Sequence, residues 1–169
     1  MKYDQKIILK NGDEAWLRNG DASDGDAVYG IFNLTHAETD YLLSYPDENS
    51  FDPEQEAQFL EEKTNSSNGI EIIAIVDGKI VGTAGIEAVG AKHKVRHRAE
   101  FGISVLKEYW GMGLGKALTG ACIECAREAG YVQLEWLLHR RNHKHSIRYI
   151  ELILLLKNPL IKIYIRTRL

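Results

Sequence analysis

Runs of apolar residues, several of them alternating with polar ones, mark six stretches of the chain as β-strands. Asn11-Gly12 and Asp77-Gly78 each separate two of these stretches, and both dipeptides favour the two-residue turn of a β-hairpin. The sequence therefore predicts two hairpins and two further strands. The predicted strands are Lys6–Lys10, Glu14–Arg18, Ile70–Val76, Lys79–Ala88, Ala99–Leu106 and Val132–Leu138.

Two helices are predicted between the hairpins. The first follows Asp21–Asp26, an acidic stretch rich in helix-capping residues, where carboxylates complement free backbone N–H groups. The second begins at Asp52-Pro53, because proline suits the first helical position, and runs through Phe59 and Leu60 to about Lys63. The first helix is expected to turn four apolar residues towards the core: Val28, Ile31, Phe32 and Leu34.

A third helix is predicted over residues 113–128, and Gly130 is its C-terminal stop. Apolar residues recur three or four apart along this helix, as in a helix with one buried face. They are Leu114, Leu118, Ala121 and Cys125. Hairpins followed by a strand, a helix and a strand imply a single α/β (α+β) domain over residues 1–169, with a mixed, largely antiparallel sheet flanked by helices.

Composition narrows the class of protein. Apolar residues make up 44% and charged residues 27%, an ordinary globular balance. No window approaches the ~18 uncharged apolar residues of a membrane span, and the first residues lack the apolar run of a signal peptide. With only two cysteines, the sequence predicts a cytoplasmic protein. Residues 1–138 carry 13 basic and 23 acidic side chains, so nucleic acid is not an expected partner.

Metal binding is not expected either. Cys122 and Cys125 lie inside the predicted third helix, where packing accounts for them better than redox or metal chemistry. His139, His143 and His145 follow the last predicted strand, but no cysteine or carboxylate cluster joins them.

The most informative segment is a strand that runs into alternating glycines, Gly111, Gly113 and Gly115, and then directly into a helix. Glycines allow close approach of a ligand to the backbone, and successive N–H groups at a helix N-terminus attract anions. This is chemistry suited to a pyrophosphate, although the spacing by itself also fits a tight strand-to-helix turn. The Gly-x-Gly-x-x-Gly pattern of dinucleotide-binding folds and the Gly-Lys-Ser/Thr ending of a P-loop are both unmatched.

The whole segment from Phe101 to Leu118 resembles motif A of the GNAT acetyltransferase superfamily, whose signature is Arg/Gln-x-x-Gly-x-Gly/Ala after a strand. Gly113 and Gly115 match its two glycines, while Trp110 stands where Arg or Gln is usual. The resemblance covers roughly residues 15–142. It implies an N-acetyltransferase that uses acetyl-coenzyme A as cosubstrate and transfers acetyl directly to a primary amine of a small molecule or peptide, with no metal and no membrane partner.

The resemblance also implies a cofactor site. Backbone groups of Ile103, Ser104 and Val105 would pair with the pantetheine arm as an added strand, and Asn142 would contact the cofactor further along the chain. The pyrophosphate would lie over the glycine turn. Its predicted ligands are Trp110, Gly111, Met112, Gly113, Leu114, Gly115 and Lys116.

Two residues are candidates for proton transfer. Glu100 begins the central strand, where the family often has a carboxylate, and would act as the base that deprotonates the amine. The competing interpretation is a salt-bridged residue at a strand end. Tyr149 would be the acid that protonates the departing thiolate, and N–H groups near Val105 would polarise the thioester carbonyl. The acidic stretch Glu38–Tyr41 lies where the family builds its acceptor wall, although solvated helix surface also explains it.

The resemblance weakens towards the C-terminus. Ser146-Ile147-Arg148-Tyr149 is one residue further from Asn142 than the family pattern, no Gly-Phe follows, and residues 152–169 contain no acidic residue and no glycine. A shifted reading frame and a diverged terminus both explain this. Residues 148–169 are therefore expected to be atypical. In place of the usual closing hairpin, residues 152–169 should form a long helix, an irregular strand or a segment exchanged with a partner chain. A homodimer would then cover exposed apolar surface, and the alternative function is a degenerate coenzyme A-binding module without turnover.

Overall fold

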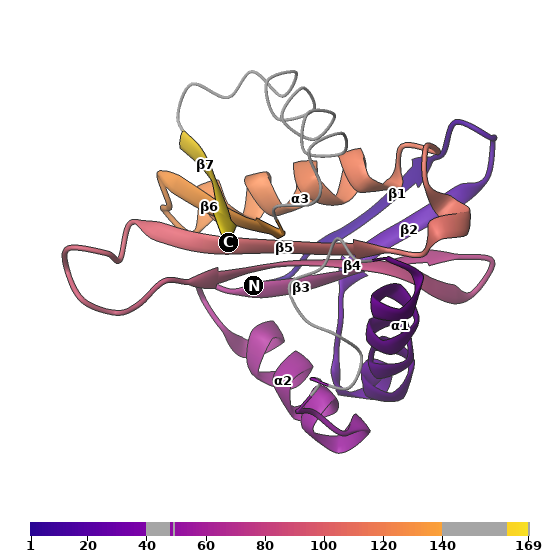
Figure 1. Ribbon diagram of the computed structural model, residues 1–169, viewed down its shortest axis with the longest axis horizontal. Helices are drawn as coiled ribbons and strands as arrows, with labels where there is room; N and C mark the ends of the chain where they lie inside the picture. The colour runs from indigo at the N-terminus through magenta and orange to yellow at the C-terminus, as the bar shows by residue number, and fades with distance from the viewer. Residues whose placement is uncertain (40–47, 49, 140–161, 169) are drawn as a thin grey trace.

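The computed structural model describes residues 1–39, 48, 50–139 and 162–168, and gives only the backbone from residue 137 onwards. Figure 1 shows a sheet with helices on both faces. The strands are β1 (Asp4–Ile8), β2 (Glu14–Asn19), β3 (Ile70–Val76), β4 (Lys79–Ala88), β5 (Arg98–Val105), β6 (Gln133–His139) and β7 (Lys162–Arg168). The helices are α1 (Gly25–Glu38), α2 (Pro53–Asn65) and α3 (Leu114–Glu128), with short 3-10 turns η1 (Ala22–Asp24) and η3 (Lys107–Tyr109).

The described strands form one sheet of seven strands in sequence order. Neighbours from β1 to β5 are antiparallel, whereas the β5–β6 and β6–β7 pairs are parallel. Helix α3 covers one face, and α1 and α2 cover the other (Figure 1). This confirms the mixed, largely antiparallel sheet flanked by helices that the sequence predicts.

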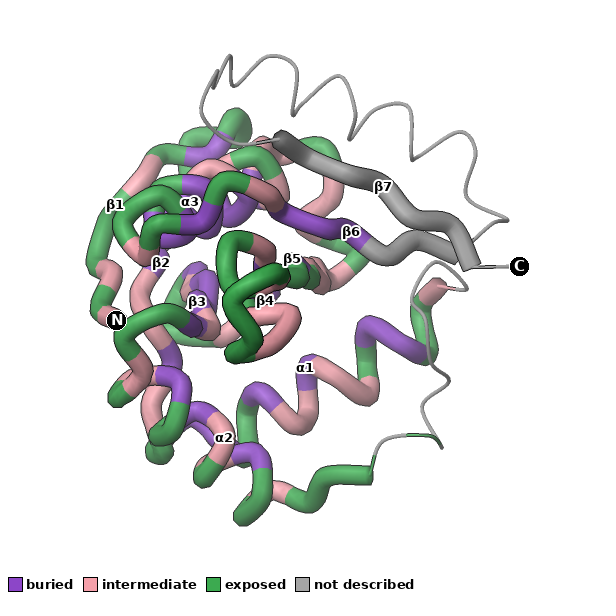
Figure 2. The backbone as a smooth tube through the Cα atoms, turned by 90° about the vertical axis from the view of Figure 1, so that its left-hand side faces the viewer, coloured by how far each residue is buried: buried purple, intermediate pink, exposed green. Residues whose placement is uncertain are grey.

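The period-two alternation of strand side chains divides the core between the two faces. On the α3 face, Ile70, Ile72 and Ala74 of β3 pack with Leu114 and Leu118 of the helix in the larger apolar cluster. On the α1/α2 face, a smaller cluster contains Val28, Leu60 and Ile73. Figure 2 shows that buried positions gather on the inner sides of the helices. The α1/α2 face therefore has fewer apolar contacts and more room for polar side chains.

Local signals explain most element boundaries. Asp77 and Gly78 both have positive φ, 49° and 75°, as the predicted two-residue hairpin turn requires. Helix α2 begins with a capping box, in which the Asp52 side chain accepts from the Gln55 N–H at 2.8 Å and the Gln55 side chain accepts from the Asp52 N–H at 2.9 Å.

One core prediction is wrong. Leu34 is 54% exposed, because the buried positions of α1 follow Val28, Ile31 and Thr35 and leave Leu34 on the solvent side. Thr35 is tolerated there because its hydroxyl donates to the Ile31 carbonyl at 2.8 Å.

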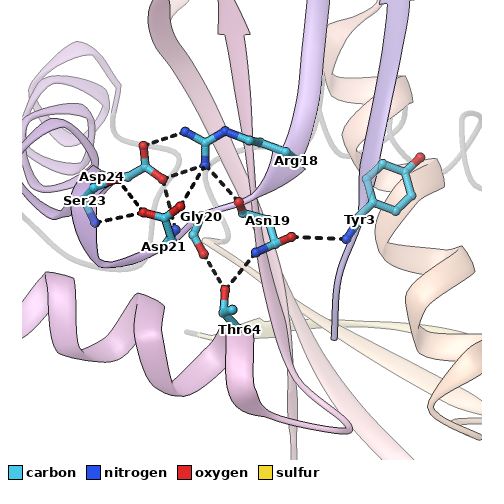
Figure 3. Close-up of polar contacts among 8 residues, drawn as sticks. All are labelled: Tyr3, Arg18, Asn19, Gly20, Asp21, Ser23, Asp24 and Thr64. Carbon is cyan, nitrogen blue, oxygen red and sulfur yellow. Dashed lines mark hydrogen bonds and ion pairs between the residues drawn. The ribbon is translucent and has the colours of Figure 1, made fainter.

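A polar network joins the N-terminal strands to both helices of the α1/α2 face (Figure 3). Arg18 at the end of β2 makes a bidentate pair with Asp24, at 2.7 and 2.8 Å. Asn19 donates to the Thr64 hydroxyl of α2 at 2.8 Å, and Thr64 donates to the Gly20 carbonyl at 2.7 Å. These contacts fix where α1 starts and where α2 ends against β2.

The tail departs from an antiparallel closing hairpin in the part that the structure describes. Strand β7 pairs with β6 in parallel, from Gln133 opposite Lys162 to His139 opposite Arg168. Residues 148–161 of the predicted atypical segment lie outside the described residues. Within the described ranges, none of the helices combines the length and apolar character that crossing a bilayer would need.

Candidate functional site

Strands β5 and β6 separate part-way along their length. They pair only from Arg98 opposite Gln133 to Phe101 opposite Trp136, although β5 continues to Val105 and β6 to His139. Beyond Trp136, β6 keeps its pairing with β7 alone among the described strands. One edge of β5 therefore loses its partner strand at residue 102, in the middle of the sheet.

The backbone groups at this edge can be assigned from the ladder. The Leu106 N–H donates to the Val81 carbonyl at 3.0 Å, so even-numbered residues of β5 direct their backbone groups towards β4. Ile103 and Val105 direct theirs to the other side, where pairing with β6 has ended. Of the three predicted pantetheine-binding residues, Ile103 and Val105 present backbone groups to the gap, whereas those of Ser104 face β4.

The glycine turn follows directly from this edge. Gly111 and Gly113 have positive φ, 80° and 98°, conformations that favour glycine, and Gly113 is the N-cap of α3. Gly113 has no side chain to cap the helix, and the first helical bond runs from the Ala117 N–H to the Gly113 carbonyl at 3.1 Å. The N–H groups of Leu114, Gly115 and Lys116 are therefore left for a ligand or water. This arrangement fits an anion.

Trp110 holds the turn to the strand. Its indole N–H donates to the Val105 carbonyl at 2.7 Å. Because the indole N–H is used in this bond, only the backbone of Trp110 or the rest of its ring could contact the pyrophosphate. The side chain positions the glycine turn relative to the free edge of β5.

The β1–β2 hairpin supplies a residue that the sequence did not point to. The Lys10 N–H donates to the Met112 carbonyl at 3.0 Å, and the Lys10 side chain passes over Gly113, with Cγ 3.8 Å from the position of a built Cβ. Figure 1 shows the hairpin tip beside the turn that leads into α3. Within the described residues Lys10 forms no ion pair, so its ammonium group is available to an anion at the turn.

Glu100 lies one residue before the point where the strands separate. It is exposed on the α1/α2 face, between Glu87 of β4 and Glu135 of β6 in the register. Among the described residues it has no ion pair. The salt bridge at this strand end is formed instead by Arg98 and Glu135. The general-base role of Glu100 stays a prediction.

Glu71 on β3 is a second carboxylate of this face that the sequence did not point to. Its pKa is raised to about 7, chiefly by burial; Lys63 and a hydrogen bond with the Thr83 side chain lower the pKa, and the charges of Glu56 and Glu87 raise it. The only local signal is one acidic residue in an otherwise apolar strand. An acidic residue in an apolar strand indicates either a functional site or a structural ion pair, and the sequence does not distinguish the two.

The remaining predicted site residues are either engaged in another contact or outside the described part of the chain. The Glu38 carboxylate accepts from the Lys107 N–H at 2.8 Å, so it joins the end of α1 to the turn after β5. Asn142 and Tyr149 lie outside the described residues. Within the described part of the chain, no group of histidine, cysteine or acidic side chains is arranged to hold a metal ion, and both cysteines are buried free thiols.

A surface pocket of about 300 Å³ lies at the opposite end of the β1–β2 hairpin. Lys2, Tyr3, Asp4, Arg18, Asn19 and Asp21 line it. Several of these side chains belong to the network of Figure 3, which fixes α1 and α2. The pocket is therefore separate from the edge of β5 and the glycine turn.

Comparison with known proteins agrees with this geometry. The family model described as "Acetyltransferase (GNAT) family" matches residues 32–152. No curated protein sequence matches the chain.

Solved structures give the same picture. An acetyltransferase of the GNAT family from Streptococcus pneumoniae superposes with a TM-score of 0.75 at 28% identity, over 81% of this chain and 82% of that one. The acetyltransferase yncA from Salmonella typhimurium, solved with acetyl-CoA, gives 0.67 at 20% identity over 82% and 78%. PaiA N-acetyltransferase from Thermoplasma acidophilum, solved with coenzyme A, gives 0.66 at 15% identity over 81% and 87%. The last two likenesses concern the fold.

Proposed function

Because the chain belongs to the acetyltransferase (GNAT) family, we propose that it transfers the acetyl group of acetyl-coenzyme A to a primary amine by direct attack. The observation that supports this most is the continuity of two features: the free edge of β5 and the glycine turn with uncapped N–H groups. The first suits an extended arm with amide groups, and the second suits a pyrophosphate. Coenzyme A has both parts in that order.

The residues present fit this cosubstrate. Ile103 and the N–H of Val105 would hold the pantetheine arm, and the first-turn amides of α3 would hold the pyrophosphate. Lys10, whose aliphatic stem passes over Gly113, would add a positive charge near the same place. Bound there, acetyl-coenzyme A would supply an activated acetyl group close to the point where β5 and β6 separate.

Glu100 is the proposed general base. A primary amine is protonated at neutral pH and must lose a proton to become a nucleophile, directly or through water. The Glu100 carboxylate is exposed on the face opposite α3 and is adjacent in sequence to Phe101, the last residue of β5 that pairs with β6. It can therefore accept that proton near the attacking nitrogen. A backbone N–H group near Val105, other than the one that holds the pantetheine arm, would stabilise the negative charge that develops on the carbonyl oxygen.

Asn142 and Tyr149 stay predictions, as cofactor ligand and general acid. The proposal also includes a cytoplasmic location, which the two free cysteines support, and a homodimer, which the position of β7 at the sheet edge supports. The acceptor is proposed to be a small molecule or a peptide.

The alternative function is a coenzyme A-binding module without turnover, which the atypical tail favours. Release of free thiol from acetyl-coenzyme A, measured with and without a panel of primary amines, separates the two. Amine-dependent thiol release that accompanies acetylation of the amine supports the transferase. Binding of coenzyme A with no amine-dependent release supports the binding module.

A further inference from the structure

Three register-matched positions on the α1/α2 face of the sheet form a row of one carboxylate and two glycines. Glu71 of β3 lies opposite Gly85 of β4, and Gly85 lies opposite Gly102 of β5. The row ends at the free edge of β5, next to the proposed site of acetyl transfer. It therefore connects a partly buried carboxylate to the proposed reaction centre across two glycines.

The Glu71 side chain lies across the first glycine. A Cβ built on Gly85 would be 1.9 Å from Glu71 Oε2, so only glycine leaves room for this carboxylate. Above Gly102 the situation is different, because no described atom lies within 4 Å of a built Cβ and the residue is exposed. The carboxylate of Glu71 thus points along the row towards open space over β5. Glu71 itself keeps part of its surface accessible.

A second carboxylate reaches the same region from α2. Glu56 is only 8% exposed, and within the described structure its side chain has no hydrogen bond and no ion pair. Its charge is one of the causes that raise the pKa of Glu71, after burial. A buried carboxylate without a partner is costly, because ionisation then lacks both water and a counter-charge.

The cations nearby do not balance these acids. Lys63 of α2 forms an ion pair with Glu87 at 3.0 Å and also acts on Glu71. Arg98 is paired with Glu135. Among the described residues, Lys63 and Arg98 are the cations that pair with acids of this face, and Glu56 and Glu100 form no ion pair. The charge deficit is one that a cationic ligand would fill.

On the basis of the proposed function, we propose that the Glu71 carboxylate binds a second cationic group of the acceptor, so that the acceptor is a diamine. The reacting amine would lie over Gly102 near Glu100, and the distal ammonium group would lie at the Glu71 carboxylate. Adjacent strands are about 4.8 Å apart. Because Glu71 already extends over Gly85, a short aliphatic spacer covers the remaining distance to β5.

The test compares 1,4-diaminobutane with butylamine, which has the same carbon chain and lacks the second ammonium group. Specificity constants (kcat/KM) are measured by thiol release for the wild type, Glu71→Gln and the matched control Glu62→Gln. Glu62 is an exposed residue of α2. The wild type is expected to prefer the diamine about tenfold or more, the size of one charge-assisted hydrogen bond. Glu71→Gln should remove most of this preference, and Glu62→Gln should keep it.

Calorimetric titration of 1,4-diaminobutane into the coenzyme A-bound protein gives a readout independent of turnover. Binding by the wild type and by Glu62→Gln, with loss in Glu71→Gln, supports the cation site even if acetylation fails. Equal kcat/KM for the two amines, or a Glu71→Gln variant that loses activity equally on both, overturns the inference and leaves the transferase proposal standing. Absence of diamine binding by the wild type also overturns it.

Discussion

The indole N–H of Trp110 donates to the backbone carbonyl of Val105 at 2.7 Å, and this bond joins the free edge of β5 to the glycine turn. The two halves of the proposed cofactor site thereby keep a fixed relative position. Trp110 stands where the family signature has Arg or Gln, so this chain orders the turn with a large aromatic side chain.

Replacement of Trp110 by Phe tests this relationship. The change keeps an aromatic ring and removes the donor to Val105, at a cost of about 1 kcal/mol, typical of a single hydrogen bond. We expect the dissociation constant of coenzyme A to rise about three- to tenfold, with a small decrease in Tm. Isothermal titration calorimetry measures the affinity. An unchanged affinity would show that the bond does not position the turn.

Lys10 offers a test of the anion site. Lys10→Ala should weaken coenzyme A binding about two- to fivefold at low salt, since an exposed charge contributes at most about 1 kcal/mol. The difference from the wild type should shrink as salt rises, because screening reduces the interaction. Lys79→Ala, an exposed lysine of β4, is the matched control. If both variants bind coenzyme A with the same affinity, Lys10 does not contribute to the anion site.

The base is tested by Glu100→Gln. This substitution keeps the shape of the side chain and removes the proton acceptor, so kcat should fall ~10²-fold or more while the affinity for coenzyme A changes little. Steady-state kinetics and calorimetry give the two quantities. A large loss of thermal stability with normal turnover per folded molecule would favour a structural role for Glu100 instead.

The raised pKa of Glu71 predicts that the free energy of unfolding depends on pH. Its pKa is about 7 in the folded protein, above the usual value of 4.5. The folded state therefore binds more protons than the unfolded state between these values, and the stability falls as pH rises through this window and then levels off. Glu56, whose pKa burial also raises, acts with the same sign, whereas Lys63 lowers the pKa of Glu71.

Glu71→Gln should thus become more stable relative to the wild type as pH rises from about 4.5 to 7. Urea unfolding at several pH values measures the free-energy difference, with Glu62→Gln as the control that should track the wild type. A difference that does not change with pH would show that Glu71 ionises alike in both states. A carboxylate that costs stability at neutral pH is better explained by ligand binding than by a structural role.

Much of the fold could be predicted because its signals are local. The Asp77-Gly78 turn, the Asp52 cap and the glycines before α3 each depend on residues a few positions apart, and each prediction is confirmed. Leu34 was misplaced because apolar spacing alone does not say which way α1 faces the sheet.

The site was only partly predictable for a related reason. Gly113 and Ile103 belong to one continuous segment with a recognisable pattern. Lys10 reaches that segment from about 100 residues away, and Glu71 gains its environment from α2 and β4. Contacts of this kind depend on the strand order and on the bulge between Ala74 and Ile75, which no short window of sequence contains.

The most direct test of the cofactor site is amide hydrogen exchange, followed residue by residue with and without coenzyme A. The N–H groups of Ile103 and Val105, at the free edge of β5, and those of Leu114, Gly115 and Lys116, at the start of α3, should become protected on binding. The N–H of Ser104, which already faces β4, should change little. Protection confined to other regions, with these five amides unaffected at saturating coenzyme A, would contradict the assignment of the site.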